Sequence, residues 1–464
     1  MSISTVTIKD KQESRQLEIK RMAIYKQSKI VEASDEQGKN YYIFFYNEQY
    51  LNYVSSEKIT KRSHVSDSFQ KGVTITPPHP IIETVLSHQP HFKKQSFNDL
   101  FKKLQQQYTL QETALIASYF ESFIKKDKLL ALIKTLFYKE RRDGKLLSCY
   151  RILQVLKDFA PNHNLVDAFS GDIQFTKYDE RYKHGDEAIL AKDPIYVEKK
   201  LYSSKHHDHS FHKLEAIYNR QSRHLDLIAI YIPRVVHTQN IDDYRTLLSL
   251  ISEQFGDVNT LPILEDLYKR GLELETLHHD LLDAYMEFGK LEDVLTLISE
   301  KELALEPSQY QELVTIVKQK EISADSIPPE ELRKLILTLC ESKDDQASDI
   351  LHQAVTSLLQ GHTLSYILEW AKPLRGIPTA EPILQNVDEM NDISEDPNQQ
   401  RRLGELYHFF QHHHQAIECM SWDMELSKED PQPVQWLAKL YHELGMEEEH
   451  KAYQQLYIDM VKRA

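Results

Sequence analysis

The chain has 464 residues, a formal net charge of −15 and only 12 glycines, under 3% of its residues against roughly 7% in average proteins. The two nearest glycines, Gly171 and Gly185, lie 14 positions apart. A dinucleotide-binding fingerprint, a P-loop and a nucleophile elbow each need glycines within about six residues, so the sequence excludes all three motifs.

The length predicts roughly two to four domains. Cys149, Cys340 and Cys419 are far apart and show no CxxC spacing, so we expect reduced, mostly buried thiols in a cytoplasmic protein. The first residues lack the apolar segment of a secretory signal. The sequence has no apolar run of about 18 residues, so we expect no membrane span. We predict no cofactor, and the Lys-, Gln- and Ile-rich composition suggests a bacterial protein.

The charge is divided unevenly along the chain. Residues 1–220 hold 35 Lys and Arg residues and 27 Asp and Glu residues, a balance of +8, whereas residues 221–464 hold 21 and 44, a balance of −23. An acidic half repels phosphate backbones, which argues against nucleic acid as a partner, and it favours a basic protein or peptide.

The N-terminal segment is predicted to form a small β-containing module over residues 1–60. Residues 1–20 are polar, and we expect a frayed tail or a short helix there. From Ala23 onwards, aromatic and β-branched runs such as Tyr41–Tyr46 alternate with turn residues, which predicts a meander of two to four strands. A hairpin alone is marginally stable, so the module should pack on helices or on a partner.

Residues 61–95 are predicted to be an extended, Pro-rich connector, because four prolines are clustered there, from Pro77 to Pro90. A helical middle region over residues 96–215 follows. Ser96 is a good N-cap, and Thr109 with Glu112 forms a capping-box pattern. We expect helices at about 97–107, 110–124, 127–140 and 145–159, and then a mixture of loops and helices over 162–210.

Two basic segments in this region, residues 125–128 and 139–142, alternate with aromatic residues. A phosphate- or RNA-binding patch is one interpretation. Amphipathic helices with charged ends explain the same spacing, and we favour them.

An internal repeat with a period of about 34 residues, a length typical of helix–turn–helix repeats, appears between residue 216 and the C-terminus. It aligns the segments that begin at Tyr244, His278 and Tyr310, and further on those that begin at Leu403 and Leu437. Such a period predicts units that stack into an α-solenoid over 216–464. Small residues such as Gly404 and Ala416 would let the two helices of a unit approach closely.

The C-terminal units resemble tetratricopeptide repeats. The consensus positions are filled in one unit by Leu403, Gly404, Tyr407, Ala416 and Met420, and in the next by Trp436, Leu437, Ala438, Tyr441 and Gly445. His450 departs from the pattern, since it stands where an alanine is expected. Residues 278–310 resemble a pentatricopeptide unit equally well, through Tyr285, Gly289, Leu291, Val294 and Pro307. The resemblance covers about half of the chain and implies a protein that binds partners on a concave surface, with no catalytic residues.

Four histidines within seven residues, His206, His207, His209 and His212, are the strongest candidate metal ligands. In a helix, His209 and His212 would share a face, and three imidazoles around an open position would suit zinc. The alternative, which we favour, is a polar linker before a helix. We likewise interpret residues 412–414, a run of three histidines, as a solvated loop between the helices of the best repeat unit.

The sequence therefore predicts a mainly α-helical, non-catalytic scaffold that binds a protein or peptide. Tyr366, Trp370 and Trp422 are the candidate partner-binding residues, because the repeat pattern explains Trp370 and Trp422 least well. The first alternative is a peptide-sensing regulator. A metal-dependent enzyme and an RNA-binding repeat protein rank below it. The sequence does not indicate an oligomeric state.

Overall fold

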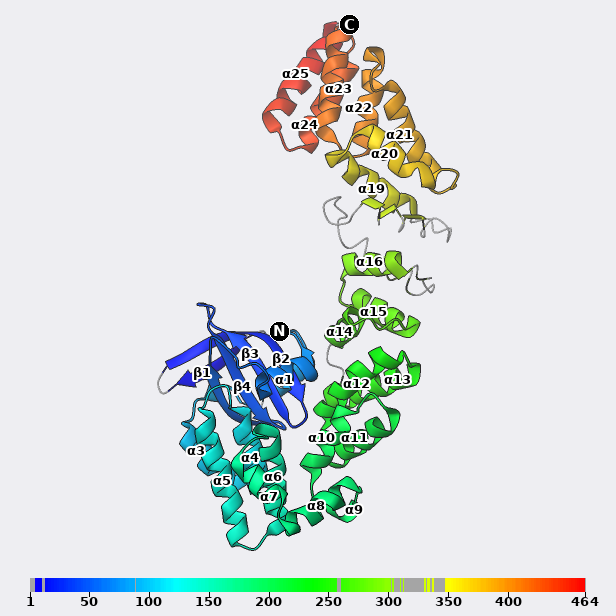
Figure 1. The fold of residues 1–464 in the computed structure, drawn as a ribbon. Helices are drawn as coiled ribbons and strands as arrows, with labels where there is room; N and C mark the ends of the chain where they lie inside the picture. The colour runs from blue at the N-terminus through cyan, green and yellow to red at the C-terminus, as the bar shows by residue number, and fades with distance from the viewer. Residues whose placement is uncertain are drawn as a thin grey trace. The chain divides into compact units, whose positions relative to one another are not determined.

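In the computed structural model the chain forms two compact units, Met1–Leu277 and His278–Ala464 (Figure 1). The predictions for Cys340, for Pro307 and for the repeat segment beginning at Tyr310 lie outside the described residues. The structure describes residues 5–10, 13–87, 89–256, 260–301, 303, 309, 312, 329–330, 332–333, 336–337 and 347–463.

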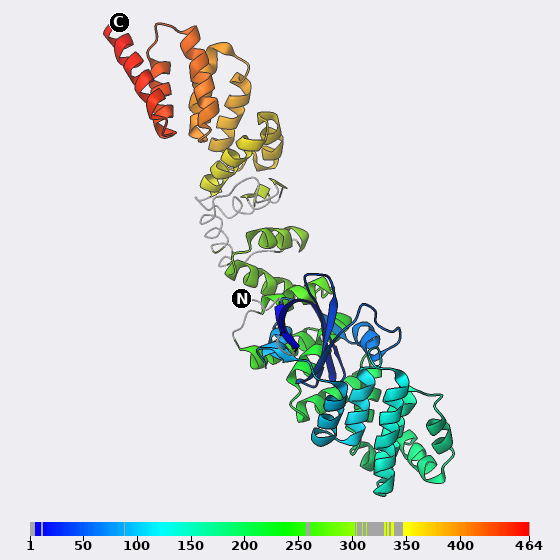
Figure 2. The ribbon, with the colours of Figure 1, turned by 90° about the vertical axis from the view of Figure 1, so that its left-hand side faces the viewer.

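The first unit begins with a sheet whose strand order is β5-β4-β3-β2-β1-β7, with β6 paired to β2. The short β7 runs parallel to β1, and Asn52 of β5 exchanges two side-chain hydrogen bonds of 2.9 Å with the backbone of Gln95, just after β7. The sheet therefore curls on itself in a barrel-like manner (Figure 2). The strands are β1 Thr5–Asp10, β2 Glu13–Tyr25, β3 Ser28–Ser34, β4 Asn40–Tyr46, β5 Gln49–Ser55, β6 Val73–Ile75 and β7 Phe92–Lys93.

Strand β4 is buried on both faces. Phe44 points to the helices and lies 4.7 Å from the ring of Phe120, whereas its neighbour Phe45 points to the other face and lies 5.6 Å from Phe92. Successive side chains of a strand point to opposite faces, so the aromatic run of β4 fills two cores at once. This confirms the prediction that the sheet packs on helices.

Two predictions about the N-terminal segments are wrong. Residues 5–10 and 13–25 are strands rather than a tail or helix, because Leu17 and Ile19 point into the core between charged neighbours that face solvent. Residues 61–95 are not extended, because they form α1 (His64–Lys71), α2 (Pro80–Ser87) and the strands β6 and β7. Pro80 opens α2, where a missing N–H costs nothing. The predicted boundaries at residues 60, 95 and 215 stay predictions.

The helices after residue 96 follow the predicted caps. Ser96 caps α3, and Thr109 with Glu112 closes the capping box of α4, which ends at Tyr119, five residues earlier than expected. Residues 162–210 consist of short helices and turns. The bounds are α3 Phe97–Gln107, α4 Leu110–Tyr119, α5 Lys126–Arg142, α6 Leu146–Phe159, α7 Asn164–Ser170, α8 Ile173–Lys183, α9 Glu187–Leu190, α10 Pro194–Ser203, α11 Asp208–Arg220, α12 His224–Thr238, α13 Ile241–Phe255 and α14 Leu261–Lys269.

The second unit is helical throughout its described residues. In both views α22 to α25 lie side by side, and each packs on the next (Figures 1 and 2). The bounds, including α15, which begins in the first unit, are α15 Glu275–Glu287, α16 Leu291–Lys301, α19 Ala347–Gly361, α20 Leu364–Ala371, η1 Lys372–Leu374, α21 Glu381–Ile393, η2 Pro397–Gln399, α22 Gln400–Phe409, α23 His413–Leu426, α24 Gln432–Glu443 and α25 Glu447–Arg463.

Gly404 shows why a small residue is needed between α22 and α23. A Cβ at this position would lie 2.9 Å from Cε of Met420 and 3.1 Å from Cβ of Cys419. Ala416 and Met420 are fully buried in the same contact, together with Leu437 of α24. The close approach of consecutive helices that the repeat predicted is therefore present.

Candidate functional site

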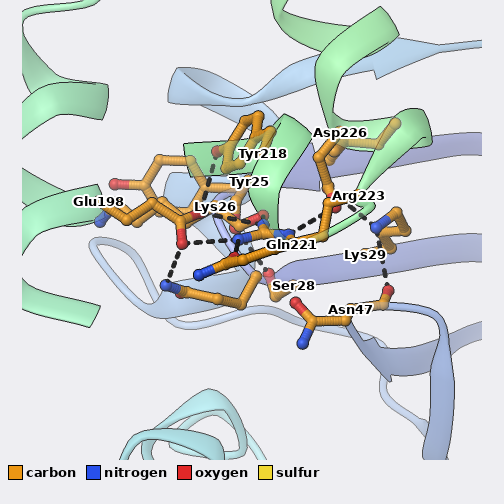
Figure 3. Close-up of polar contacts among 12 residues, drawn as sticks. Tyr25, Lys26, Ser28, Lys29, Asn47, Glu198, Tyr218, Gln221, Arg223 and Asp226 are labelled. Carbon is orange, nitrogen blue, oxygen red and sulfur yellow. Dashed lines mark hydrogen bonds and ion pairs between the residues drawn. The ribbon is translucent and has the colours of Figure 1, made fainter. Parts of the chain in front are cut away.

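A buried network of ion pairs and hydrogen bonds connects the turn between β2 and β3 to the helices of the first unit (Figure 3). The Nζ of Lys29 donates to Oδ1 of Asp226 over 2.9 Å and to the carbonyl oxygen of Asn47 over 3.0 Å. The side chains of Lys29 and Asp226 are 0% and 2% exposed. Burying an ion pair costs desolvation free energy, so such a pair persists where its hydrogen bonds are satisfied.

Arg223 of the α11–α12 turn is the centre of the network. Its Nε donates to Oδ2 of Asp226 over 3.0 Å, and its two Nη atoms donate to the carboxylate of Glu198 over 2.7 and 3.0 Å. Tyr218 and Gln27 also donate to Glu198, over 2.9 and 2.7 Å. The two cations, Lys29 and Arg223, are therefore balanced by two carboxylates.

The electrostatics of the network favour its ionised state. Burial alone would raise the pKa of Asp226, but the charges of Lys29 and Arg223 and their hydrogen bonds outweigh it, and the pKa is lowered. Arg223 also donates to the carbonyl oxygen of Lys26 over 2.9 Å. The network therefore fixes the backbone of the turn that carries Lys26, a residue with a left-handed φ of 57°.

Next to this turn lies a cavity of about 470 Å³, within the first unit. Its walls come from β2, the segment before α1, and helices α1, α4, α5, α6 and α10. The charged residues among its lining are the cations Lys26, Lys61, Arg62, Lys126 and Lys199 and the acids Asp67, Glu121 and Asp158.

The acids of this cavity are already engaged. Asp158 pairs with Lys199 at 2.5 Å, Asp67 pairs with Lys71 at 2.7 Å, and Glu121 accepts the backbone N–H of His64 over 2.6 Å.

Four of the cations, by contrast, form no ion pair among the described residues. These cations are Lys26, Lys61, Arg62 and Lys126. Arg62, like Lys26, has a left-handed φ, here 59°. Left-handed non-glycine residues are uncommon and cluster at functional sites. The cavity therefore carries uncompensated positive charge and is suited to an anion.

Burial changes the protonation of two residues in the cavity. It lowers the pKa of Lys26 to about 8, with a further contribution from the charge of Lys199, while the Nζ of Lys26 lies 4.3 Å from the centre of the Tyr25 ring. Burial also lowers the pKa of His64 to about 3, so this imidazole is neutral at physiological pH. His64 stacks on Tyr119 at 3.8 Å and hydrogen-bonds Ser28 over 2.8 Å, which makes it part of the wall.

The four histidines singled out in the sequence lie at the start of α11 and are all exposed. The ring of His206 lies 5.8 Å from that of His237, and Nδ1 of His212 lies 3.1 Å from a carboxylate oxygen of Glu215. Within the described part of the chain, none of the four belongs to a group of three converging metal-ligating atoms.

The predicted partner-binding residues are in different environments. Tyr366 on α20 is 38% exposed and stacks on His362 at 4.2 Å, and Trp422 on α23 is 60% exposed. Trp370 is only 2% exposed, and its indole N–H donates to the carbonyl oxygen of Pro329 over 2.6 Å. This burial corrects the prediction for Trp370, which is a core residue.

The two basic segments of the middle region lie at opposite ends of α5, so they do not form one patch.

Cys149 and Cys419 are free and buried, as predicted, and burial raises the pKa of each thiol to about 11.

Sequence reasoning missed the cavity and the network. Lys26 and Lys29 appear in the sequence as ordinary polar residues near a turn. The only local signal is that Tyr25 and Ile30 flank the short polar stretch between two apolar runs, which is typical of a hairpin. The partners of Lys29 and Lys26 lie 197 residues away in the chain, beyond the reach of any spacing rule.

Comparisons with known proteins do not place the chain in a family. No family model matches it, and no curated protein sequence matches it. Among solved structures, a chain in the structure of Naa15/Naa10 bound to HypK-THB aligns with 79% of this chain and 61% of its own length, at 12% identity and a TM-score of 0.20. This chain thus spans less than two thirds of that protein, and a likeness at this level transfers no residue role.

The fold and the site define a mainly helical protein with an N-terminal barrel-like sheet. None of the helices that the structure describes combines the length and the apolar character needed to cross a membrane.

Proposed function

We propose that this chain is a non-catalytic, cytoplasmic adaptor whose second unit, a tetratricopeptide-like solenoid, binds a basic segment of a partner protein. The observation that carries the proposal is the exposed face of α23. Trp422 and Leu426 lie one turn apart on it and are 60% and 55% exposed. Glu418 and Glu425 stand one turn before and after Trp422 on the same face, and both are exposed.

The charge of the second unit supports a basic partner. Residues 278–464 hold 16 Lys and Arg residues and 35 Asp and Glu residues, a formal charge of −19. Neither Glu418 nor Glu425 has an ion-pair partner among the described residues. An arginine or lysine side chain over the face of Trp422 would gain a cation–π contact of about 0.5–1 kcal/mol at such an exposed site, and the two carboxylates would add Coulomb attraction.

The proposal is tested by affinity capture of partners from lysate with the full chain, followed by binding measurements on each purified partner. We expect Trp422→Ala and the double variant Glu418→Gln/Glu425→Gln to weaken binding tenfold or more. Binding should also weaken as salt rises, because exposed charges are screened over about 8–10 Å at physiological ionic strength.

A matched control removes the same charge elsewhere in the unit. Glu447 and Glu448 are exposed in the first turn of α25, so Glu447→Gln/Glu448→Gln should leave the affinity within about twofold. The proposal is refuted if the control and the α23 variants lower the affinity equally, or if a partner binds Trp422→Ala as tightly as the unchanged chain.

A second candidate function, sensing of a small anionic ligand, is favoured by the cavity of the first unit. Lys26, Lys61, Arg62 and Lys126 form no ion pair there among the described residues, and the volume of about 470 Å³ is in the range of small-molecule sites. Inorganic phosphate and citrate are suitable probes, one compact and one extended. Each should raise the unfolding temperature of the chain and of an exposed-lysine control, Lys20→Met, but not of Lys26→Met. Equal shifts in both variants would contradict this function.

A further inference from the structure

The structure brings two histidines and a glutamate together in the second unit, away from the face of α23 described above. Nε2 of His408, at the end of α22, lies 2.9 Å from Oε2 of Glu443, at the end of α24. Nδ1 of His413, in the first turn of α23, lies 3.8 Å from the same oxygen. One potential ligand atom from each residue lies within 4.8 Å of the other two.

We propose that His408, His413 and Glu443 form a binding site for a divalent transition-metal ion of the zinc class. Zinc takes imidazole nitrogens and a carboxylate oxygen at about 2.0–2.2 Å, usually in tetrahedral geometry. Two ligands of a tetrahedral centre are then about 3.4 Å apart. The two measured separations, 2.9 and 3.8 Å, lie on either side of that value, so small side-chain rotations would suffice.

The hydrogen bonding around the site points to a missing partner. Nδ1 of His413 is buried and has no hydrogen-bond partner among the described residues. Buried polar atoms without partners are rare in folded proteins, and each needs an explanation. A metal ion between His413 and Glu443 would supply that partner.

The neighbouring Lys439 lies nearer the other carboxylate oxygen of Glu443 and leaves Oε2 to the two histidines. Lys439 lies 3.9 Å from the other oxygen, Oε1, and its Nζ lies 4.5 Å from the centre of the Trp436 ring. His408 packs edge-on against Trp436 with ring centres 5.3 Å apart, which restrains its imidazole.

The repeat explains why the site forms. Tyr407 and Tyr441 occupy equivalent positions in two consecutive units, and His408 and Glu443 closely follow one of them each. Successive units therefore bring the same ends of α22 and α24 together, and the first turn of α23 adds His413. The metal would join three consecutive helices and leave a fourth position to water or to a group from a ligand. His413 is thus part of a three-helix cluster, whereas the sequence predicted a solvated loop.

The test uses the full chain without an affinity tag. Equilibrium dialysis against Zn²⁺ with elemental analysis should give one tightly bound ion, and Co²⁺ should give the visible absorption of a tetrahedral centre. We expect His408→Gln, His413→Gln and Glu443→Gln each to weaken Zn²⁺ binding tenfold or more, because the loss of even a second-shell partner typically costs 10–100-fold. His414→Gln, an exposed neighbour on α23, should bind like the unchanged chain.

The circular dichroism of each variant shows whether it is folded. Zn²⁺ should raise the unfolding temperature of the unchanged chain and of His414→Gln, but not that of the three ligand variants. The inference is overturned if His413→Gln and Glu443→Gln keep the Zn²⁺ affinity of the unchanged chain. It is also overturned if His414→Gln loses affinity to the same extent, or if the unchanged chain binds no more Zn²⁺ than a variant that combines His408→Gln, His413→Gln and Glu443→Gln.

Discussion

Replacing Lys29 by methionine should destabilise the first unit strongly, because the change leaves Asp226 buried without its nearest cation. At the observed 2.9 Å and an effective dielectric constant of about 20, the attraction between the two charges is about 6 kcal/mol. The relieved desolvation of the lysine offsets part of this loss, and breaking one side of a buried pair typically costs about 3–5 kcal/mol. Arg223 still donates to Asp226, so we expect the lower end of that range, about 3 kcal/mol.

The placement of tryptophan makes this prediction easy to measure. All three tryptophans, at positions 370, 422 and 436, belong to the second unit, so their fluorescence follows its unfolding alone. In a urea titration, Lys29→Met should move a transition seen by far-UV circular dichroism to lower urea and leave the fluorescence transition unchanged. Lys20→Met, which removes a partner from an exposed pair with Glu18, should change the stability by no more than about 0.5 kcal/mol.

A double variant distinguishes the loss of charge balance from a loss of packing. Lys29→Met/Asp226→Leu keeps Arg223 paired with Glu198 and leaves no unpaired charge in the network, so it should recover much of the stability lost in Lys29→Met. The reasoning is refuted if Lys29→Met is as stable as Lys20→Met. It is equally refuted if the double variant loses as much stability as the sum of the losses in the single variants Lys29→Met and Asp226→Leu.

Three further predictions follow from the described contacts. In tryptophan-monitored unfolding, Gly404→Ala should lower the stability of the second unit by up to about 2 kcal/mol, because overpacking costs about 1–3 kcal/mol and the gain in helix propensity is about 1 kcal/mol. Gly361→Ala is the control: nothing lies within 4 Å of the added Cβ, so this variant should be neutral or stabilising. Because Asp226 has a lowered pKa in the folded state, its contribution to stability should be complete above about pH 4 and lost as the pH falls further, and the double variant should lack this part of the acid sensitivity. With a pKa of about 8, Lys26 should be acetylated before Lys20 in limited labelling at pH 8 followed by peptide mapping, and equal rates would contradict its assigned environment.

Local sequence patterns correctly predict those helices and strands whose formation depends on neighbouring residues in the chain. The aromatic run of β4 is a strand, and the caps at Ser96 and Thr109 begin helices where expected. Strand β2 also carries the period-two alternation of a strand, since Leu17 and Ile19 alternate with Glu18 and Lys20, but the polar composition of the segment obscures it.

The sites could not be found in this way, because their residues come together only in the folded chain. Nothing near Lys29 in the sequence indicates that its amino group is fully buried. Trp370 and Trp422 look alike in the sequence, yet one is a core residue and the other is largely exposed. His413 is a candidate ligand only because α24 places Glu443 beside it, although the sequence predicts the two in different repeat units.

Strand β4 has a consequence for how the sheet is assembled. It has no solvent face, so a slip of one residue would exchange Phe44 with Phe45 between two apolar cores without exposing a polar side chain. Its hydrophobic pattern therefore does not select its register, which depends on the turns on either side and on the hydrogen bonds that Tyr42 and Tyr46 donate to Glu32 and Glu112. Gly38 and Asn47 hold those turns with φ of 77° and 52°. We therefore expect that inserting or deleting one residue in either turn scrambles the sheet, although both are surface loops, where length changes are ordinarily tolerated.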